Sequence, residues 1–293
     1  MLAADLIKRI RKLEIATRKA VSDTLAGQYH SVFKGRGMAF SEVRQYQPGD
    51  EIRTIDWNVT ARMNDAYVKV FTEERELTVM LLVDVSASKE FASRGQSKSE
   101  IAAEVAAQIA FSAIANNDRV GLILFSDRVE HVIPPKKGRK HVLRVVTDIL
   151  AFKPQGRGTD LGAGLNYLSR IAKRKTVTFL ISDFLVQDIE KPLRIVSQKH
   201  DLVPVVISDP MEETFPKLGM VMMEDPETGE RLIVDTSDPL VRGEFARLMQ
   251  SGRDERRRLF KKLELDHVEL RAGEEYVNAL ARFFRMRSRR MAA

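Results

Sequence analysis

Apolar runs alternate with amphipathic segments along residues 77–287 of this 293-residue chain. The run at 77–83 lacks the polar alternation of a half-exposed strand, so it predicts a strand buried on both faces. Further strands are predicted at 119–125, 176–182, 202–207 and 267–270, and helices at 101–115, 141–150, 189–199, 239–263 and 274–286, with another around 165–171. This alternation predicts an α/β fold: a doubly wound, mostly parallel sheet with helices on both faces.

Two hairpins interrupt the simple alternation. Residues 128–133 follow a Ser-Asp turn after the strand at 119–125, which predicts an antiparallel edge strand that ends at Pro134 and Pro135. Two short apolar runs, at 220–223 and 231–234, predict a second hairpin inserted near 218–235.

Two of the predicted helices carry local signals of their own. Ser97 and Glu100 form a capping-box pattern, which predicts that a helix begins there and continues through the apolar run at 101–115. The helix at 239–263 has a possible interruption at Ser251 and Gly252.

The same pattern divides the chain into four parts. Residues 1–24 predict an amphipathic helix, 25–76 a small β-rich subdomain, 77–273 the α/β domain, and 274–293 a C-terminal helix with a basic tail. The first helix would dock its apolar stripe on the protein itself, with attachment to a membrane surface as the alternative. The stripe consists of Leu2, Leu6, Ile10 and Leu13.

The predicted subdomain at 25–76 is rich in glycine and aromatic residues and lacks helical periodicity. Residues 47–50, Gln-Pro-Gly-Asp, form a turn signature, and short strands are predicted at 52–57 and 66–71. Tyr46 and the sole tryptophan, Trp57, have two interpretations. They anchor the subdomain against the main sheet, or, together with Arg53, they form a partner-binding surface.

The composition restricts the location and the chemistry. The chain has no cysteine, which excludes disulfides, zinc-thiolate sites, iron-sulfur ligation and cysteine nucleophiles, and which fits a reducing compartment. No apolar run approaches the roughly 18 to 20 residues that cross a bilayer. The N-terminus also carries charges throughout, where a signal peptide would have an apolar core. We therefore expect a cytoplasmic protein without stable membrane insertion.

The net charge of +7 gathers near the two ends, at 8–19, 253–262 and 282–290. Such clusters raise the possibility of nucleic-acid binding. Because charged helical faces and solvated tails are commoner, we expect no specific nucleic-acid partner.

Oxygen-bearing side chains occur in three predicted loops at one edge of the sheet. The first group directly follows the strand at 77–83, the second lies in a glycine-rich loop at 153–162, and the third follows the strand at 176–182. Ligands of doubly wound sheets sit at the carboxyl ends of the strands, and hydroxyl and carboxylate oxygens suit Mg2+, or Mn2+. The candidate metal ligands are Asp84, Ser86, Ser88, Thr159 and Asp183.

Two of these loops also allow other interpretations. The alternative for Asp84, Ser86 and Ser88 is a turn that is capped by its own side chains. The glycine-rich loop lacks the Gly-Lys-Ser/Thr of a phosphate-binding loop, so the sequence disfavours nucleotide binding.

The five residues resemble the metal-ion-dependent adhesion site of von Willebrand factor A domains. The resemblance to such a domain extends over about residues 77–272. Asp84, Ser86 and Ser88 match its first motif, Thr159 its second and Asp183 its third. A more specific resemblance, over about 25–235, is to the bacterial family known as domain of unknown function fifty-eight. The segments that carry it are 35–37, 46–50 and 53–57, with Arg62.

This resemblance implies a mechanism and a partner. Ser86, Ser88 and Thr159 would touch the metal directly, and Asp84 and Asp183 would act largely through waters. The ion would then keep an open position for a partner's carboxylate. Family members are similar to proteins encoded beside MoxR-type AAA+ ATPases, which implies an adaptor that works with such an ATPase. Many members carry membrane-spanning helices before this region, whereas here a charged helix is predicted.

A metal-dependent hydrolase acting on a phosphate or peptide substrate is the alternative function, because a bound dication can polarise a phosphate or activate water. The five histidines, His30, His131, His141, His200 and His267, all lie outside the motif loops, and no second acid pair is spaced for two-metal catalysis. The sequence therefore favours a non-enzymatic, magnesium-dependent protein-interaction module.

Overall fold

The computed structural model describes residues 29, 32, 38–63, 65–73, 76–90 and 96–292. The chain consists of two compact units: residues 33–77 form the smaller one, and residues 1–32 together with 78–293 form the larger one. The helix predicted at 1–24 lies outside the described residues.

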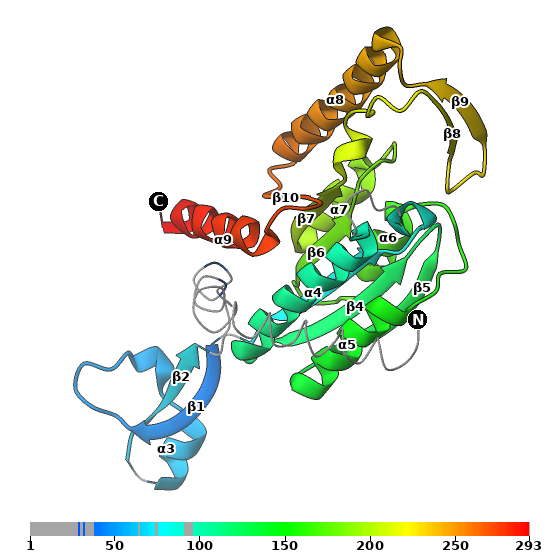
Figure 1. Ribbon diagram of the computed structural model, residues 1–293. Coiled ribbons are helices and arrows are strands. Elements are labelled where there is room, and N and C mark those ends of the chain that lie inside the picture. The colour runs from blue at the N-terminus through cyan, green and yellow to red at the C-terminus, as the bar shows by residue number, and fades with distance from the viewer. Residues whose placement is uncertain are drawn as a thin grey trace. The chain divides into compact units, whose positions relative to one another are not determined.

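A six-stranded sheet forms the centre of the larger unit (Figure 1). Its strands are β3 (Thr78–Asp84), β4 (Arg119–Phe125), β5 (Val129–Lys136), β6 (Val177–Ser182), β7 (Asp201–Ser208) and β10 (Val268–Arg271). They lie in the order β10-β7-β6-β3-β4-β5, and each neighbouring pair is parallel except β4 and β5. The predicted class, a doubly wound and mostly parallel α/β sheet, is confirmed.

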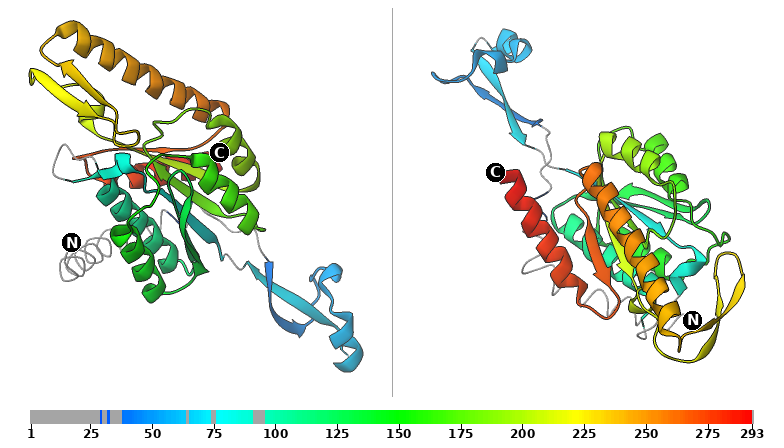
Figure 2. Two further views of the ribbon diagram at one scale, coloured as in Figure 1. Left: turned by 90° about the vertical axis from the view of Figure 1, so that its right-hand side faces the viewer. Right: turned by 90° about the horizontal axis from the view of Figure 1, so that it is seen from above.

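Helices cover both faces of the sheet (Figures 1 and 2). On one face α4 packs against α5, and on the other α6 packs against α7. The long helix α8 and the C-terminal helix α9 follow. The bounds are α4 Lys98–Ala115, α5 Arg139–Ala151, α6 Leu161–Ile171, α7 Glu190–Lys199, α8 Pro239–Lys262 and α9 Tyr276–Ala292.

The uniformly apolar sequence of β3 follows from this two-sided cover. Met80 and Leu82 belong to an apolar cluster that α6 and α7 complete. Val79 and Leu81 point to the opposite face, because successive side chains of a strand alternate, and both are fully buried. A strand with helices on both sides has no exposed face for polar residues.

The edge strand β5 continues through Pro134 and Pro135 to Lys136, so the predicted strand end was wrong. Proline cannot donate a ladder hydrogen bond, but β5 lies at the edge of the sheet, where one side of the strand needs no partner. The register with β4 also shifts between Val120 and Leu122, opposite the two prolines. The predicted break in α8 is likewise absent, since this helix continues through residues 251–252.

The smaller unit is an antiparallel strand pair with two short helices. It contains β1 (Met38–Gln45), the 3-10 helix η2 (Ile52–Thr54), α3 (Trp57–Met63) and β2 (Tyr67–Glu73). The turn predicted at 47–50 is confirmed, because the Asp50 backbone N–H donates to the Gln47 carbonyl at 3.0 Å.

The strand predicted at 52–57 was wrong, since residues 52–54 form η2, Ile55 makes an isolated bridge to Val68, and Trp57 begins α3. Asp56 explains the helix, because its Oδ1 accepts from the backbone N–H groups of Asn58, at 3.0 Å, and Val59, at 3.3 Å. An aspartate in this position satisfies N–H groups that a helix start leaves without partners.

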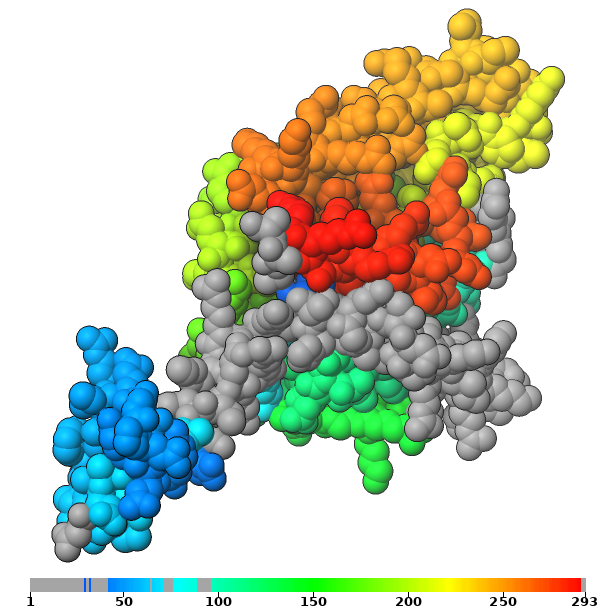
Figure 3. All heavy atoms as spheres, turned by 90° about the vertical axis from the view of Figure 1, so that its left-hand side faces the viewer, coloured from blue at the N-terminus to red at the C-terminus, as the bar shows by residue number. Residues whose placement is uncertain are grey.

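Two further strands, β8 (Met220–Glu224) and β9 (Arg231–Asp235), form an antiparallel hairpin where one was predicted. Figure 3 shows α8 running along the surface, with this hairpin beside its N-terminal part. Within the part of the chain that the structure describes, none of the helices combines the length and apolar character needed to cross a bilayer.

Candidate functional site

The candidate site lies where the chain changes direction in the sheet. β3 is followed outward by β4 and β5, and the chain then returns to place β6 on the other side of β3. Asp84 ends β3, and Asp183 directly follows β6, so their side chains meet between adjacent parallel strands. Ligands of doubly wound sheets bind in the crevice at this kind of topological switch point.

Asp84 is 2% exposed and is held by donors from the loop after β3 and from β6. Its Oδ1 accepts from the Ser86 backbone N–H at 3.0 Å, and its Oδ2 accepts from the Ser182 hydroxyl at 2.6 Å. A buried carboxylate needs such donors, because burial removes its hydration. Ser182 is therefore a part of the site that sequence reasoning missed.

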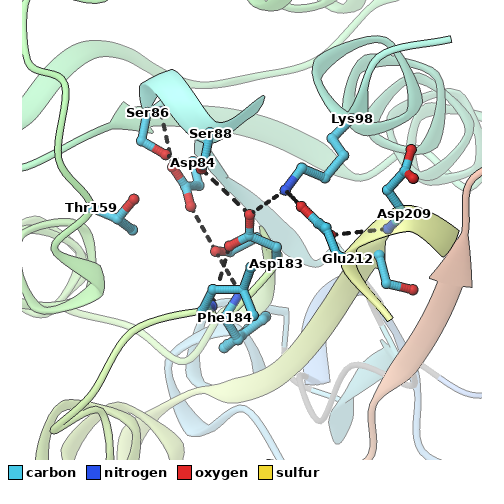
Figure 4. A network of polar contacts seen from close by, with 12 residues as sticks. Asp84, Ser86, Ser88, Lys98, Thr159, Asp183, Phe184, Asp209 and Glu212 are labelled. Atoms are coloured by element: carbon cyan, nitrogen blue, oxygen red, sulfur yellow. Dashed lines mark hydrogen bonds and ion pairs between the residues drawn. The ribbon is translucent and has the colours of Figure 1, made fainter. Parts of the chain in front are cut away.

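The hydroxyls of the first motif connect Asp84's loop to Asp183 (Figure 4). Ser86 Oγ and Ser88 Oγ are 3.1 Å apart, and Ser88 Oγ donates to Asp183 Oδ2 at 3.4 Å. Four of the five predicted ligands, Asp84, Ser86, Ser88 and Asp183, are thus linked in one hydrogen-bonded group.

A sharp turn fixes Asp183. The next residue, Phe184, has a left-handed backbone with φ of 56°, and its N–H donates to the Ser182 hydroxyl at 3.1 Å. Its buried ring packs edge-on against Phe260 of α8, with centroids 5.4 Å apart. An outlying conformation of this kind persists only where its surroundings determine it, and it occurs preferentially at functional sites.

Thr159 lies in the glycine-rich loop, which is tied to two neighbouring segments. Ala87 N–H donates to the Arg157 carbonyl at 3.1 Å, which joins this loop to the first motif. On the other side, Glu130 Oε1 accepts from the backbone N–H of Gly156 at 2.7 Å and from the Ser126 hydroxyl at 2.7 Å. Burial works to raise the pKa of Glu130, but these donors outweigh it, and the pKa is lowered.

Gly156 brings the loop very close to the end of β4. A Cβ at this position would lie 2.3 Å from both Ser126 Oγ and Asp127 Oδ1, far inside contact distance. The glycine therefore lets the loop reach the strand end, and it positions Thr159 three residues later.

Thr159 makes a contact that the sequence did not predict. Its hydroxyl donates to Glu227 Oε1, in the turn of the β8–β9 hairpin, at 2.7 Å. Thr159 lies at the margin of the group formed by the other four residues (Figure 4). No hydrogen bond between Thr159 and those four is observed within the described residues.

A buried lysine reaches the same group from α4. Lys98 is 1% exposed, and its Nζ lies 2.7 Å from Asp183 Oδ2 and in contact with Glu212 (Figure 4). The capping box of Ser97 and Glu100 is present as predicted, and it makes Lys98 the first residue of the helix. The motif carboxylate Asp183 therefore already has one cationic partner within the protein.

Glu212 is placed by a second capping box. It belongs to the short helix η4 (Pro210–Glu212), whose N-cap Asp209 accepts from Met211 N–H at 2.9 Å. Glu212 Oε2 in turn accepts from Asp209 N–H at 3.1 Å, which leaves its other oxygen directed to Lys98.

The donor set suits a hard cation. All five predicted ligands offer oxygen, from hydroxyls and carboxylates, which is the preference of Mg2+ and Mn2+. Among the described residues, no three His, Cys, Asp or Glu side chains are grouped so as to hold a metal. A cation here would therefore depend on the serine and threonine hydroxyls as well as on the carboxylates.

A cleft of about 700 Å3 adjoins Asp183. Its walls come from the loop after β6, the end of β7 and the middle of α8. Leu185 and Leu248 line it and are 51% and 55% exposed. Arg256 also lines it, donates to the Asp183 carbonyl at 3.3 Å, and has a pKa lowered by burial.

The predicted partner-binding residues all lie in the smaller unit. Tyr46 follows β1 and its N–H donates to the Ala66 carbonyl at 2.8 Å. Arg53 is exposed in η2, and Trp57, the first residue of α3, is 67% exposed. Trp57 therefore does not belong to the core of its own unit.

Sequence reasoning missed Lys98, Ser182, Glu212, Glu130 and Glu227. Two of them had a signal in the sequence: Lys98 stands inside the recognised capping box, and Asp209-Pro-Met-Glu212 is itself a capping-box pattern. Ser182 directly precedes the predicted ligand Asp183 at the end of its strand, whereas Glu130 and Glu227 carry no local pattern that points to the site.

Comparisons with known proteins give a family and several relatives. A family model described as "Protein of unknown function DUF58" matches residues 42–255. The uncharacterised protein Rv1480 of Mycobacterium tuberculosis is 30% identical over 284 residues, which is 96% of this chain and 89% of that protein. The uncharacterised protein YeaD of Bacillus subtilis is 30% identical over 101 residues, 34% of this chain and 23% of its own length.

Solved structures also resemble the chain. BatB from Bacteroides thetaiotaomicron has a TM-score of 0.45 at 14% identity, covering 73% of this chain and 99% of that one. The VWA domain of SpRpn10 has a TM-score of 0.40 at 12% identity, covering 72% of this chain and 95% of that one.

Proposed function

The chain belongs to the family described as protein of unknown function DUF58 and has a von Willebrand factor A-like fold, and on that premise we propose that it is a Mg2+-dependent protein-interaction module. The proposal treats it as a binding protein and not as an enzyme. Mn2+ would serve as the alternative ion.

One observation carries the proposal. The hydroxyls of Ser86 and Ser88 and the carboxylates of Asp84 and Asp183 gather at the topological switch point of the sheet. These residues, with Thr159, would hold the ion. Hydroxyl ligands are neutral, so a bound dication would keep much of its charge and could attract an acidic side chain of a partner.

The positions of the histidines support a binding role. His131 contacts Asp148, His141 the Val120 carbonyl and His200 the Thr176 hydroxyl, so each of the three is engaged outside the motif loops. Lys98 is a base candidate beside Asp183, but it is in contact with two carboxylates. A hydrolase would need a water activated by a general base or by the metal ion itself, and within the described residues these three histidines are not placed to act as that base.

The partner we propose is a MoxR-type AAA+ ATPase. This choice rests on the family resemblance, and the hydrogen-bonded site supports only the kind of chemistry, a carboxylate presented by a protein. A cytoplasmic location belongs to the same proposal and agrees with the cysteine-free sequence.

Calorimetric titration of Mg2+ and Mn2+ tests the site. Ser88→Ala removes a hydroxyl that bridges Ser86 and Asp183, and it should weaken metal affinity at least about tenfold while the protein remains folded. Ser197→Ala is the matched control, because that hydroxyl bonds only the Arg194 carbonyl of its own helix. Unchanged affinity in the Ser88 variant would show that the metal assignment is wrong.

The partner is tested by binding the purified ATPase with Mg2+ and with chelator. Metal-dependent binding that Ser88→Ala abolishes is the expected result. Equal binding in all conditions would show that the metal has no role in recognition of the partner. Metal-dependent phosphatase or peptidase activity of the purified protein would favour the alternative function, a hydrolase.

A further inference from the structure

The turn of the β8–β9 hairpin touches the candidate site through Glu227. Residues 222–233 are all described, and each is exposed except Glu227, which is partly buried. Its Oε1 accepts the Thr159 hydroxyl at 2.7 Å, and its Oε2 would lie 3.8 Å from a Cβ at Gly158. The hairpin thus presents one carboxylate to the loop that carries the second motif.

The turn itself is built to hold Glu227 at its tip. Asp225 Oδ1 accepts from the Glu227 N–H at 2.8 Å, and this hydrogen bond is the main cause that lowers the pKa of Asp225. Asp225 N–H donates to the Glu230 carbonyl at 2.8 Å, and Gly229, with φ of +75°, closes the turn. An aspartate that bonds its own backbone two residues on is a stable turn device, so the glutamate is preorganised.

Within the described residues, the two strands of the hairpin pair with each other and not with the main sheet. At the base, Leu218 N–H and Thr236 N–H donate to the opposite strand end, and Arg242 of α8 donates to the Thr236 carbonyl at 2.7 Å. Large apolar side chains are exposed on both of its faces. They are Met220, Met222, Leu232 and Ile233, each more than 60% exposed.

We propose that Glu227 is an internal ligand of the site, which occupies the place of the partner's carboxylate and must be displaced when the partner binds. This inference rests on the proposed function, since it assumes that the site receives an acidic side chain. It adds a regulatory element: the hairpin competes with the partner for the same position.

The chemistry of the contact decides what Glu227 blocks. The Thr159 hydroxyl donates a hydrogen bond to Glu227, and the lone pairs of its oxygen are not used in this bond. The contact therefore leaves the oxygen able to bind a cation. A second carboxylate beside Glu227 would meet like charge, which disfavours it. Glu227 therefore competes with an acidic partner while leaving the metal ligands in place.

The competition has a calculable consequence. A partner that binds only the open form is weakened by the fraction of molecules in that form. One hydrogen bond to a charged acceptor favours the closed form by roughly tenfold or more. Removing Glu227 should therefore strengthen the binding of an acidic ligand by about that factor.

The position of the hairpin is measured first, without metal, as the distance between two spin labels in the full chain by double electron–electron resonance. The absence of native cysteine permits labels at Met222→Cys in β8 and Asn166→Cys in α6, two exposed positions. Glu227→Ala should broaden the distance distribution, and Glu230→Ala, an exposed acid of the same turn, should not. An unchanged distribution in the Glu227 variant would overturn the inference.

Ligand competition is measured next with the nine-residue peptide of residues 223–231, MEDPETGER, in Mg2+ and in chelator. It should bind the Glu227→Ala protein about tenfold tighter than the native protein, and a peptide carrying E227Q should bind weakly to both. Equal, Mg2+-dependent affinity for the two proteins contradicts the internal ligand alone. Binding that ignores Mg2+ contradicts the proposed function alone, and no binding to the Glu227 variant contradicts both.

Discussion

Replacing Lys98 by methionine would test whether the buried ammonium holds the candidate site together. Lys98 and Asp183 have side chains 1% and 4% exposed, and their Nζ and Oδ2 atoms are 2.7 Å apart. Methionine has a similar length and fills most of the same volume, so the change removes a charge without opening a large cavity.

The expected loss of unfolding free energy depends on the hydrogen bonds and solvent exposure that Asp183 and Glu212 keep without Lys98. Removing one member of a buried ion pair typically costs about 3–5 kcal/mol, because the other charge stays buried. Asp183 keeps the N–H of Leu185 at 3.3 Å, and Glu212 is 19% exposed, so we expect the lower end, about 3 kcal/mol. For a unit of this size such a loss lowers Tm by roughly 6–12 °C.

Urea and thermal unfolding of Lys98→Met measure this directly, with Lys140→Met, an exposed lysine in the first turn of α5, as the control. Adding Asp183→Asn to the Lys98 variant should recover part of the loss, because the uncompensated carboxylate is then neutral. Mg2+ should stabilise the Lys98 variant more than the native protein. A loss under about 1 kcal/mol, or an equal loss in the control, would refute the reasoning.

Two further predictions concern pH. Burial lowers the pKa of His200, whose Nδ1 accepts from the Thr176 N–H at 3.3 Å. The neutral imidazole therefore contributes fully to stability at pH values above 6.5, the ordinary pKa of histidine. This contribution is lost as the pH falls below that value. His200→Gln should flatten the unfolding free energy between about pH 7.5 and 5.5, and an unchanged slope would count against this role. Glu130, whose pKa is lowered, contributes above its ordinary value of 4.5, and that contribution is lost at lower pH. Glu130→Gln should cost about 1 kcal/mol at pH 7, much less at pH 3, and weaken Mg2+ binding by loosening the Thr159 loop, as calorimetry at pH 7 would show.

Prediction from the sequence succeeded where the signal is local. The apolar run at 77–83 predicted β3 because a strand between two helical layers has no face that water reaches. Ser97 and Glu100 predicted the start of α4 because their mutual hydrogen bonds lie within one turn. The prolines after residue 133 misled, since whether a strand tolerates them depends on its place in the sheet, which no local pattern records.

The sequence by itself therefore determined the α/β class, most strands and helices, and the placement of Asp84 and Asp183 at strand ends. Only the tertiary structure decided which groups surround them. Lys98 and Asp183 are 85 residues apart in the chain, and Thr159 and Glu227 are 68 apart. Periodicity and capping act within a few residues, whereas such contacts depend on how helices and loops pack on the sheet. For that reason the buried ammonium and the glutamate at Thr159 became visible only in the folded protein.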